Sequence, residues 1–360
     1  MSVRALLLCL ALCTALSGAK AAAQGFAGLG TRADGFAIPQ PGVAFRFPAD
    51  HGPHPDYRIE WWYVTADLKG ADGKDYGVQW TLFRSALSPG ATSTWSSPQI
   101  WMGNAAITTP TQHYVSERLS RDGTGAAGVT AAPFSAWIDD WQARSRAVPS
   151  AASGGDGLSH LALSATGDNF RYDLKLDAHG PIVAQGRGGY SVKSAGGQAS
   201  EYYSQPFYAV EGSLKLPGGD VAVTGEAWLD REWSSQPLSA DQTGWDWFSL
   251  HLEGGEKLMG FRLRDSGPGF ISATWIAADG TPTPLPAGAL TMTPLKMSAV
   301  AGHTVPTEWR LDIPSRHFSV TTMPLNAQAW MATRFPYWEG PIRFTGTQSG
   351  RGYLEMTGYN

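Results

Sequence analysis

The stretch EWWYVTADL at residues 60–68, followed by YGVQWTLFR at 76–84, is the part of the chain that decides the fold. A second stretch has the same plan, with WDWFSLHL at 245–252 followed by LMGFRLR at 258–264. Each contains two segments rich in aromatic residues, joined by a turn at Asp72-Gly73 or at Gly254-Gly255. This pattern is typical of a β-hairpin with a glycine turn.

The two hairpins predict an internal duplication. The alignment of Leu68 with Leu252 also pairs Trp61 with Trp245 and Tyr63 with Trp247. A second pair of segments, PIVAQGRGGY at 181–190 and PIRFTGTQSGRGY at 341–353, supports the repeat. Because the two copies lie far apart in the chain, they indicate two tandem β domains and not a solenoid.

The expected fold is all-β, with two tandem β-barrel or sandwich domains. We expect the first domain at residues 45–205 and the second at 206–360, after a loose lead-in at 24–44. The segment SAASGGDG at 150–157 is interpreted as a hairpin loop inside the first domain. The only stretch that allows a short helix lies around 326–334.

The N-terminus has the pattern of a signal peptide at residues 1–23. Arg4 precedes an apolar run, and three alanines at 21–23 form a cleavage site. The sequence therefore predicts an exported protein, periplasmic or secreted. Cys9 and Cys13 both lie within this segment, so the mature chain would contain no cysteine. We expect no membrane span in the mature chain.

The composition limits the classes of partner. The formal net charge is −4 and no basic patch is evident, which argues against nucleic acid and anionic membrane surfaces. The chain has none of the common motifs of serine hydrolases, nucleotide-binding proteins or zinc peptidases. We therefore expect no cofactor and no metal.

The segment EAWLDREWSS at 226–235 is the strongest candidate for chemistry. On a strand, alternate residues share a face, which here carries Glu226, Trp228, Asp230 and Glu232. A carboxyl group against indole rings has a raised pKa and can act as a general acid, whereas Arg231 would hold a neighbouring carboxylate ionised. The alternative is a structural pair of arginine and carboxylate that closes one end of a barrel.

Two further segments are candidates. In HGPHPDYRIEW at 51–61, the prolines disfavour a metal site, and His54 is interpreted as a hydrogen-bonding or proton-shuttling residue. In YWEG at 337–340, Glu339 either faces Asp230 or Glu60 across a shared cavity or forms an ion pair with an arginine. The tryptophans themselves either line a cavity or fill a core.

Several of these motifs together resemble the AttH / carotenoid 1,2-hydratase (hydroxyneurosporene synthase) family. The resemblance is carried by FPADHGPH at 47–54, EWWY at 60–63, GEAWLDREWSS at 225–235, GWDW at 244–247, YWEG at 337–340 and GRGYLE at 350–355. It implies two consecutive lipocalin-like domains. Relatives include hydratases of isoprenoid double bonds, exported proteins encoded beside lipid-type transporters, and fungal pericyclases. This chain departs from the hydratases around the motif at 225–235, where they favour histidine and this chain has Arg231 between Asp230 and Glu232, and at 257–262, which lacks the tyrosine and aspartate expected in a hydratase.

These observations lead to one hypothesis and two alternatives. The hypothesis is an exported protein that binds a long apolar ligand, of isoprenoid or lipid type, in a tryptophan-lined cavity. The first alternative is a cofactor-free lyase or isomerase of the hydratase type. The second is a non-catalytic accessory protein of a lipid-type ABC transporter, without a cavity.

The candidate residues fall into two groups. The candidate catalytic residues are Asp230, Glu232, Arg231 and Glu60. The candidate ligand-binding residues are Trp61, Trp62, Trp228, Trp233, Trp245, Trp247, His54, Tyr337, Trp338 and Glu339.

Overall fold

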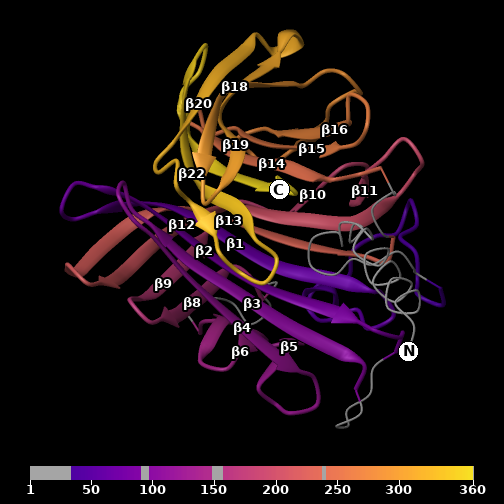
Figure 1. Ribbon diagram of the computed structural model, residues 1–360. Helices are drawn as coiled ribbons and strands as arrows, with labels where there is room; N and C mark the ends of the chain where they lie inside the picture. Colours follow the sequence, from indigo (N-terminus) through magenta and orange to yellow (C-terminus); the bar gives the residue numbers. More distant parts are fainter. Residues whose placement is uncertain (1–33, 91–96, 148–156, 237–240, 360) are drawn as a thin grey trace, which may run out of the picture.

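The computed structural model describes residues 34–90, 97–147, 157–236 and 241–359. The expected signal peptide at 1–23 and nearly all of the expected loop at 150–157 lie outside these ranges, so they stay predictions. The described residues form two curled antiparallel β-sheets (Figure 1). The prediction of an all-β protein is confirmed.

The first sheet brings together the beginning and the end of its part of the chain, because its first strand, β1, pairs with its last strand, β13. Its strand order is β4-β3-β2-β1-β13-β12-β9-β8-β7-β6-β5, and β10 and β11 also pair with β12. The strands are β1 (Ile59–Gly70), β2 (Asp75–Ala86), β3 (Gln99–Thr108), β4 (His113–Arg121), β5 (Ala127–Ala131), β6 (Phe134–Ile138), β7 (Trp141–Ser145), β8 (His160–Gly167), β9 (Phe170–Ala178), β10 (Val183–Ala184), β11 (Tyr190–Val192), β12 (Ala199–Leu216) and β13 (Gly219–Ser234). This sheet curls into a nearly closed barrel, whereas the second sheet forms a half-barrel above it (Figure 1).

The second sheet has the order β17-β16-β15-β14-β23-β22-β20-β19-β18, with β21 beside β22. Its strands are β14 (Gly244–Leu252), β15 (Lys257–Arg264), β16 (Phe270–Ile276), β17 (Pro282–Pro284), β18 (Thr291–Val300), β19 (His303–Ile313), β20 (Phe318–Pro324), β21 (Trp330–Met331), β22 (Tyr337–Gly346) and β23 (Gly350–Thr357). Two short 3-10 turns, Ala49–His51 and Pro314–Arg316, complete the described elements.

The repeat of aromatic hairpins is confirmed. The β1–β2 hairpin and the β14–β15 hairpin each pair antiparallel, and each lies next to the last strand of its own sheet, β13 or β23. The second pair of repeat segments is not equivalent. Residues 341–353 form the long β22–β23 hairpin, whereas 181–190 contain only the short β10 and the start of β11.

The chain changes sheet later than the expected join at 205/206. That position falls inside β12, and both β12 and β13 belong to the first sheet. The chain enters the second sheet between Ser234 and Gly244. The aromatic hairpins located the repeat, but they carry no information on the long strands β12 and β13, of which β13 pairs with β1 and β12 pairs with β13.

The stretch at 326–334 is extended and contains β21 instead of a helix. Its backbone carbonyls accept hydrogen bonds from β22, with Trp338 Nε1 bonded to Ala327 at 2.9 Å and the Glu339 amide to Ala329 at 2.9 Å. These bonds hold the segment along β22. Within the described ranges, no helix has the length and apolar character needed to cross a bilayer.

The hydrophobic residues form separate cores. One fills the interior of the first barrel and includes Trp62, Trp80 and Trp233. Another fills the second sheet around Trp309 and Trp338. A third cluster, with Tyr63, Trp228 and Trp247, lies where the two sheets meet. The barrel interior is therefore packed with side chains, and space for a ligand has to be sought between the sheets.

Gly77 lies where the two sheets are in contact and gives a first prediction. A Cβ atom at Gly77 would lie 2.5 Å from Pro341 Cγ and 2.5 Å from Tyr353 Oη, both in the second sheet. We expect Gly77→Ala to lower the free energy of unfolding by about 1–3 kcal/mol through overpacking, measured by urea denaturation. The control is Gly218→Ala, because no atom lies within 4 Å of the added Cβ there. Equal midpoints for the two variants would contradict this account of the sheet contact.

Candidate functional site

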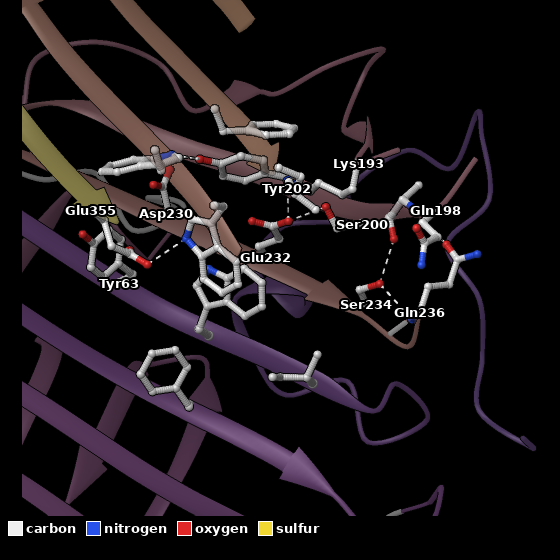
Figure 2. Close-up of a pocket in the computed structure, with 18 of the residues that line it drawn as sticks. Tyr63, Lys193, Gln198, Ser200, Tyr202, Asp230, Glu232, Ser234, Gln236 and Glu355 are labelled. Carbon is white, nitrogen blue, oxygen red and sulfur yellow. Dashed lines mark hydrogen bonds and ion pairs between the residues drawn. The ribbon is translucent and has the colours of Figure 1, made fainter. Parts of the chain in front are cut away.

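A cavity with a volume of about 120 Å³ lies between the two sheets. Strands β1, β2, β12 and β13 of the first sheet form one side, and β14, β15, β22 and β23 of the second sheet form the other. The walls are largely aromatic and include Trp61, Tyr63, Phe83, Tyr202, Trp245, Trp247 and Phe261. Figure 2 shows the acidic side chains of Asp230, Glu232 and Glu355 among these rings.

Strand alternation decides which residues of β13 reach the cavity. Asp230, Glu232 and Ser234 alternate along β13 and all line the cavity. Arg231 and Trp233 point to the opposite face, into the barrel, where Arg231 lies over the Trp62 ring at 3.9 Å. The predicted common face of Trp228, Asp230 and Glu232 is therefore present, with Trp228 Nε1 donating to Asp230 Oδ1 at 2.7 Å.

Asp230 is a buried carboxyl group that lines the cavity. Its side chain is only 2% exposed, and it accepts hydrogen bonds from Ser204 and Trp228. Burial raises its pKa to about 7, although hydrogen bonds from these two residues oppose the shift. At neutral pH a substantial fraction of Asp230 therefore carries a proton, as an acid catalyst requires.

Glu355 brings a second carboxyl group of the same kind from β23. It lines the cavity, and Trp245 Nε1 donates to its Oε1 at 2.8 Å. Burial raises the pKa of Glu355 to about 7, and the negative charge of Asp230 adds to the shift. Because an ionised Asp230 disfavours the ionisation of Glu355, a state in which one of the two acids is protonated and the other ionised is favoured near neutral pH.

Glu339 is a third buried acid and lies beside Glu355 on the neighbouring strand. The two residues are direct partners across β22 and β23, and Tyr63 from the first sheet donates a hydrogen bond to Glu339. Burial and the neighbouring charge of Glu355 raise the pKa of Glu339 well above its ordinary value. Glu339 is not among the residues that line the cavity, and its hydrogen bond is with the Tyr63 hydroxyl and not with Asp230, Glu60 or an arginine.

Glu232 has a different environment from Asp230. It accepts a hydrogen bond from Ser200 and forms an ion pair with Lys193, whose Nζ lies 2.7 Å from Glu232 Oε1. The Lys193 ammonium also lies over two rings, 4.8 Å from the Tyr202 centroid and 4.3 Å from that of Phe261. Glu232 and Lys193 therefore form a charged pair within an aromatic wall.

Glu60 and Arg231, which the sequence placed among the catalytic candidates, do not reach the cavity. Glu60 is fully buried on the barrel side of β1 and pairs with both Arg84 and Arg231. Burial alone would raise the pKa of Glu60, but the charges of the two arginines hold it well below its ordinary value. This arrangement is the structural alternative, an arginine–carboxylate cluster inside the barrel.

The ligand-binding candidates divide in the same way. Trp61, Trp245, Trp247 and Tyr337 line the cavity. Trp62 and Trp233 belong to the barrel core, where His54 stacks on Trp233 at 3.9 Å. Trp338 belongs to the core of the second sheet. Trp228 supports Asp230 by its hydrogen bond but does not itself line the cavity.

Sequence reasoning missed two charged residues of the cavity, Glu355 and Lys193. Glu355 is the last residue of the GRGYLE motif, but nothing local shows that its strand lies beside β14 and opposite β13. Lys193 follows the short β11 in a polar segment without any pattern. Only the packing of one sheet on the other brings both residues to Asp230 and Glu232.

Comparison with known proteins identifies the family. The AttH-like family model matches residues 38–359. The chain belongs to the AttH-like family. The resemblance found in the sequence is thereby confirmed, over nearly the whole of the described part of the chain.

Two solved structures show the same fold as this AttH-like chain. A candidate AttH from Nitrosomonas europaea has 31% sequence identity and a TM-score of 0.78, over 90% of this chain and 100% of its own. Kievitone hydratase from Nectria haematococca has 19% identity and a TM-score of 0.66, over 89% and 95%. Among proteins with curated descriptions, none matches this chain.

Proposed function

We propose that this protein binds a hydrophobic small molecule, of isoprenoid or lipid type, between its two sheets and adds water to one of its carbon–carbon double bonds. The observation that carries the proposal is Asp230, which is 2% exposed, has a pKa of about 7 and lies in an aromatic cavity. A neutral carboxyl group in apolar surroundings is the proton donor that an unactivated double bond needs.

The chemistry follows from the two acids. Protonated Asp230 donates its proton to one alkene carbon, which leaves a carbocation on the other. The faces of the surrounding indole rings stabilise that cation. Water then forms the new carbon–oxygen bond, and the Glu355 carboxylate accepts the proton that the water loses. Once the proton on Glu355 has returned to Asp230 through solvent, the net change is the addition of one water molecule, so the reaction consumes no cofactor, and it can run in reverse as a dehydration.

Two further observations support this proposal. Asp230 and Glu355 both have pKa values of about 7, so one acid and one base can coexist at the same pH. The fold is shared with a protein named as a hydratase, kievitone hydratase. At 19% identity that likeness concerns the fold, so the assignment of roles depends on the cavity of this chain.

Addition of water to a probe isoprenoid tests the proposal. With farnesene in oxygen-labelled water, we expect an alcohol product that carries the label, detected by mass spectrometry. Because the reaction needs one carboxyl group protonated and the other ionised, its rate should be highest near pH 7 and fall on both sides. A rate that keeps rising well above that pH would contradict the acid role. Binding of farnesene without any product would leave only a binding protein.

The cavity also bears on the hypothesis of an accessory transport protein. An accessory protein without a cavity is disfavoured, because a cavity reaches Asp230. Export stays a prediction, since residues 1–33 lie outside the described ranges. A membrane transporter as partner also stays a prediction. Sequencing the N-terminus of the native protein would decide whether a signal peptide is cleaved.

A further inference from the structure

We propose that Lys193 and Glu232 form a binding site for a hydroxyl group, so that the ligand is an unsaturated alcohol or phenol and not a plain hydrocarbon. This inference rests on the proposed function, because it names the class of substrate for the same cavity. The pair lies on the cavity wall beside Asp230, as Figure 2 shows. Neither residue takes part in the proton transfers assigned to Asp230 and Glu355.

The ammonium group of Lys193 has hydrogen-bonding capacity left for a ligand. An ammonium carries three N–H donors, and within the described residues its Nζ has one acceptor, Glu232 at 2.7 Å. The other close neighbours are the ring faces of Tyr202 and Phe261, which accept no conventional hydrogen bond. The Lys193 side chain is 19% exposed and lines the cavity, so the remaining donors are accessible from it.

The charges of the pair select the ligand group. A hydroxyl can accept a hydrogen bond from Lys193 and donate one to Glu232, so it satisfies both members of the pair. A carboxylate or phosphate would meet the negative charge of Glu232 next to Lys193, which disfavours it. A hydrocarbon would remove water from both charged groups and offer no hydrogen bond in return. An alcohol or phenol therefore fits best.

The spacing along β13 also limits where the hydroxyl lies in the ligand. Glu232 is two residues beyond Asp230 on the same face of the strand, which corresponds to about 7 Å along a β-strand. The ligand should therefore present its hydroxyl about 7 Å from the double bond that Asp230 protonates. The wall of the same cavity includes the rings of Trp245 and Trp247.

Affinities for farnesol and farnesene provide the test, because the two probes share an isoprenoid chain and differ in the hydroxyl group. Quenching of the cavity tryptophans reports binding. We expect the parent protein to bind farnesol about tenfold or more tightly, the effect of one hydrogen bond to a charged group. Lys193→Met should remove this preference, because it should lower the affinity for farnesol and leave the affinity for farnesene unchanged. Glu232→Gln, which keeps an acceptor for Ser200 and Lys193, should lower the affinity for farnesol by a smaller factor than Lys193→Met does.

The control is Lys296→Met, which removes an exposed lysine paired with Glu308 on β18 and β19. It should leave both affinities unchanged. Equal affinities of the parent for farnesol and farnesene would overturn the inference. An equal loss of affinity for both probes in Lys193→Met would overturn it as well. The proposed hydration would survive that result, because it depends on turnover and on Asp230. Failure of the parent to bind either probe would overturn both proposals.

Discussion

Replacement of Asp230 by asparagine is expected to lower the rate of water addition by about two to four orders of magnitude, the usual contribution of a general acid. Asparagine has nearly the same shape and keeps an oxygen that can accept the hydrogen bonds from Ser204 and Trp228. It has no acidic proton to donate. Affinity for farnesene should therefore persist while turnover is lost. A variant that keeps the parental rate would show that Asp230 is not the acid.

The same substitution should change the pH dependence of stability. The pKa of Asp230 is about 7 in the folded protein and about 3.9 in an unfolded chain. Between these values the unfolded state releases the proton first, so the parent loses stability as the pH rises. The Asp230→Asn variant does not lose stability in this way. Its melting temperature should therefore rise relative to that of the parent as the pH increases from about 4 to about 7. Exposed Asp173→Asn serves as the control.

Replacement of Glu60 by glutamine is expected to lower the free energy of unfolding by about 3–5 kcal/mol, because it leaves buried arginines without their counter-ion. Glu60 is the buried partner of both Arg84 and Arg231, whose side chains are 1% and 0% exposed. Urea denaturation at neutral pH would measure the effect. Glu211→Gln, which breaks an exposed pair with Lys175, should cost at most about 1 kcal/mol.

The sign of the pH effect at Glu60 is opposite to that at Asp230. Arg84 and Arg231 hold the pKa of Glu60 well below its ordinary value against the effect of burial. Its contribution to stability is therefore complete above about pH 4.3, the value for an unfolded glutamate, and is lost as the pH falls further. Because Glu60 faces the barrel and not the cavity, folded Glu60→Gln should bind farnesene like the parent. A large loss of affinity at unchanged stability would contradict this placement.

The sequence predicts the local structure well. The two aromatic hairpins are found because alternation and glycine turns act over a few residues. The same alternation places Trp228, Asp230 and Glu232 together, as the structure confirms. It also separates Arg231 from Asp230, so only Asp230 of these two candidates lines the cavity. Arg231 belongs to the barrel face with Trp62.

The rest of the site depends on how the sheets pack. Alternation shows which residues of a strand share a face, but not which face meets the barrel core and which meets the second sheet. In β1, the face that meets the barrel core carries Glu60 among arginines, and the face that meets the second sheet carries Trp61 at the cavity. Glu355 and Lys193 reach Asp230 and Glu232 from distant strands, and no short-range pattern encodes such contacts.

The ionisation of Asp230 and Glu355 tests the account most directly, because it needs no knowledge of the natural ligand. NMR of carbon-labelled carboxyl groups would follow each acid as the pH changes. The account predicts signals that titrate near pH 7, one absent from Asp230→Asn and another absent from Glu355→Gln. If the signals of both residues titrated at ordinary values, near about pH 4, the cavity would hold no proton donor at neutral pH and the proposed chemistry would be wrong.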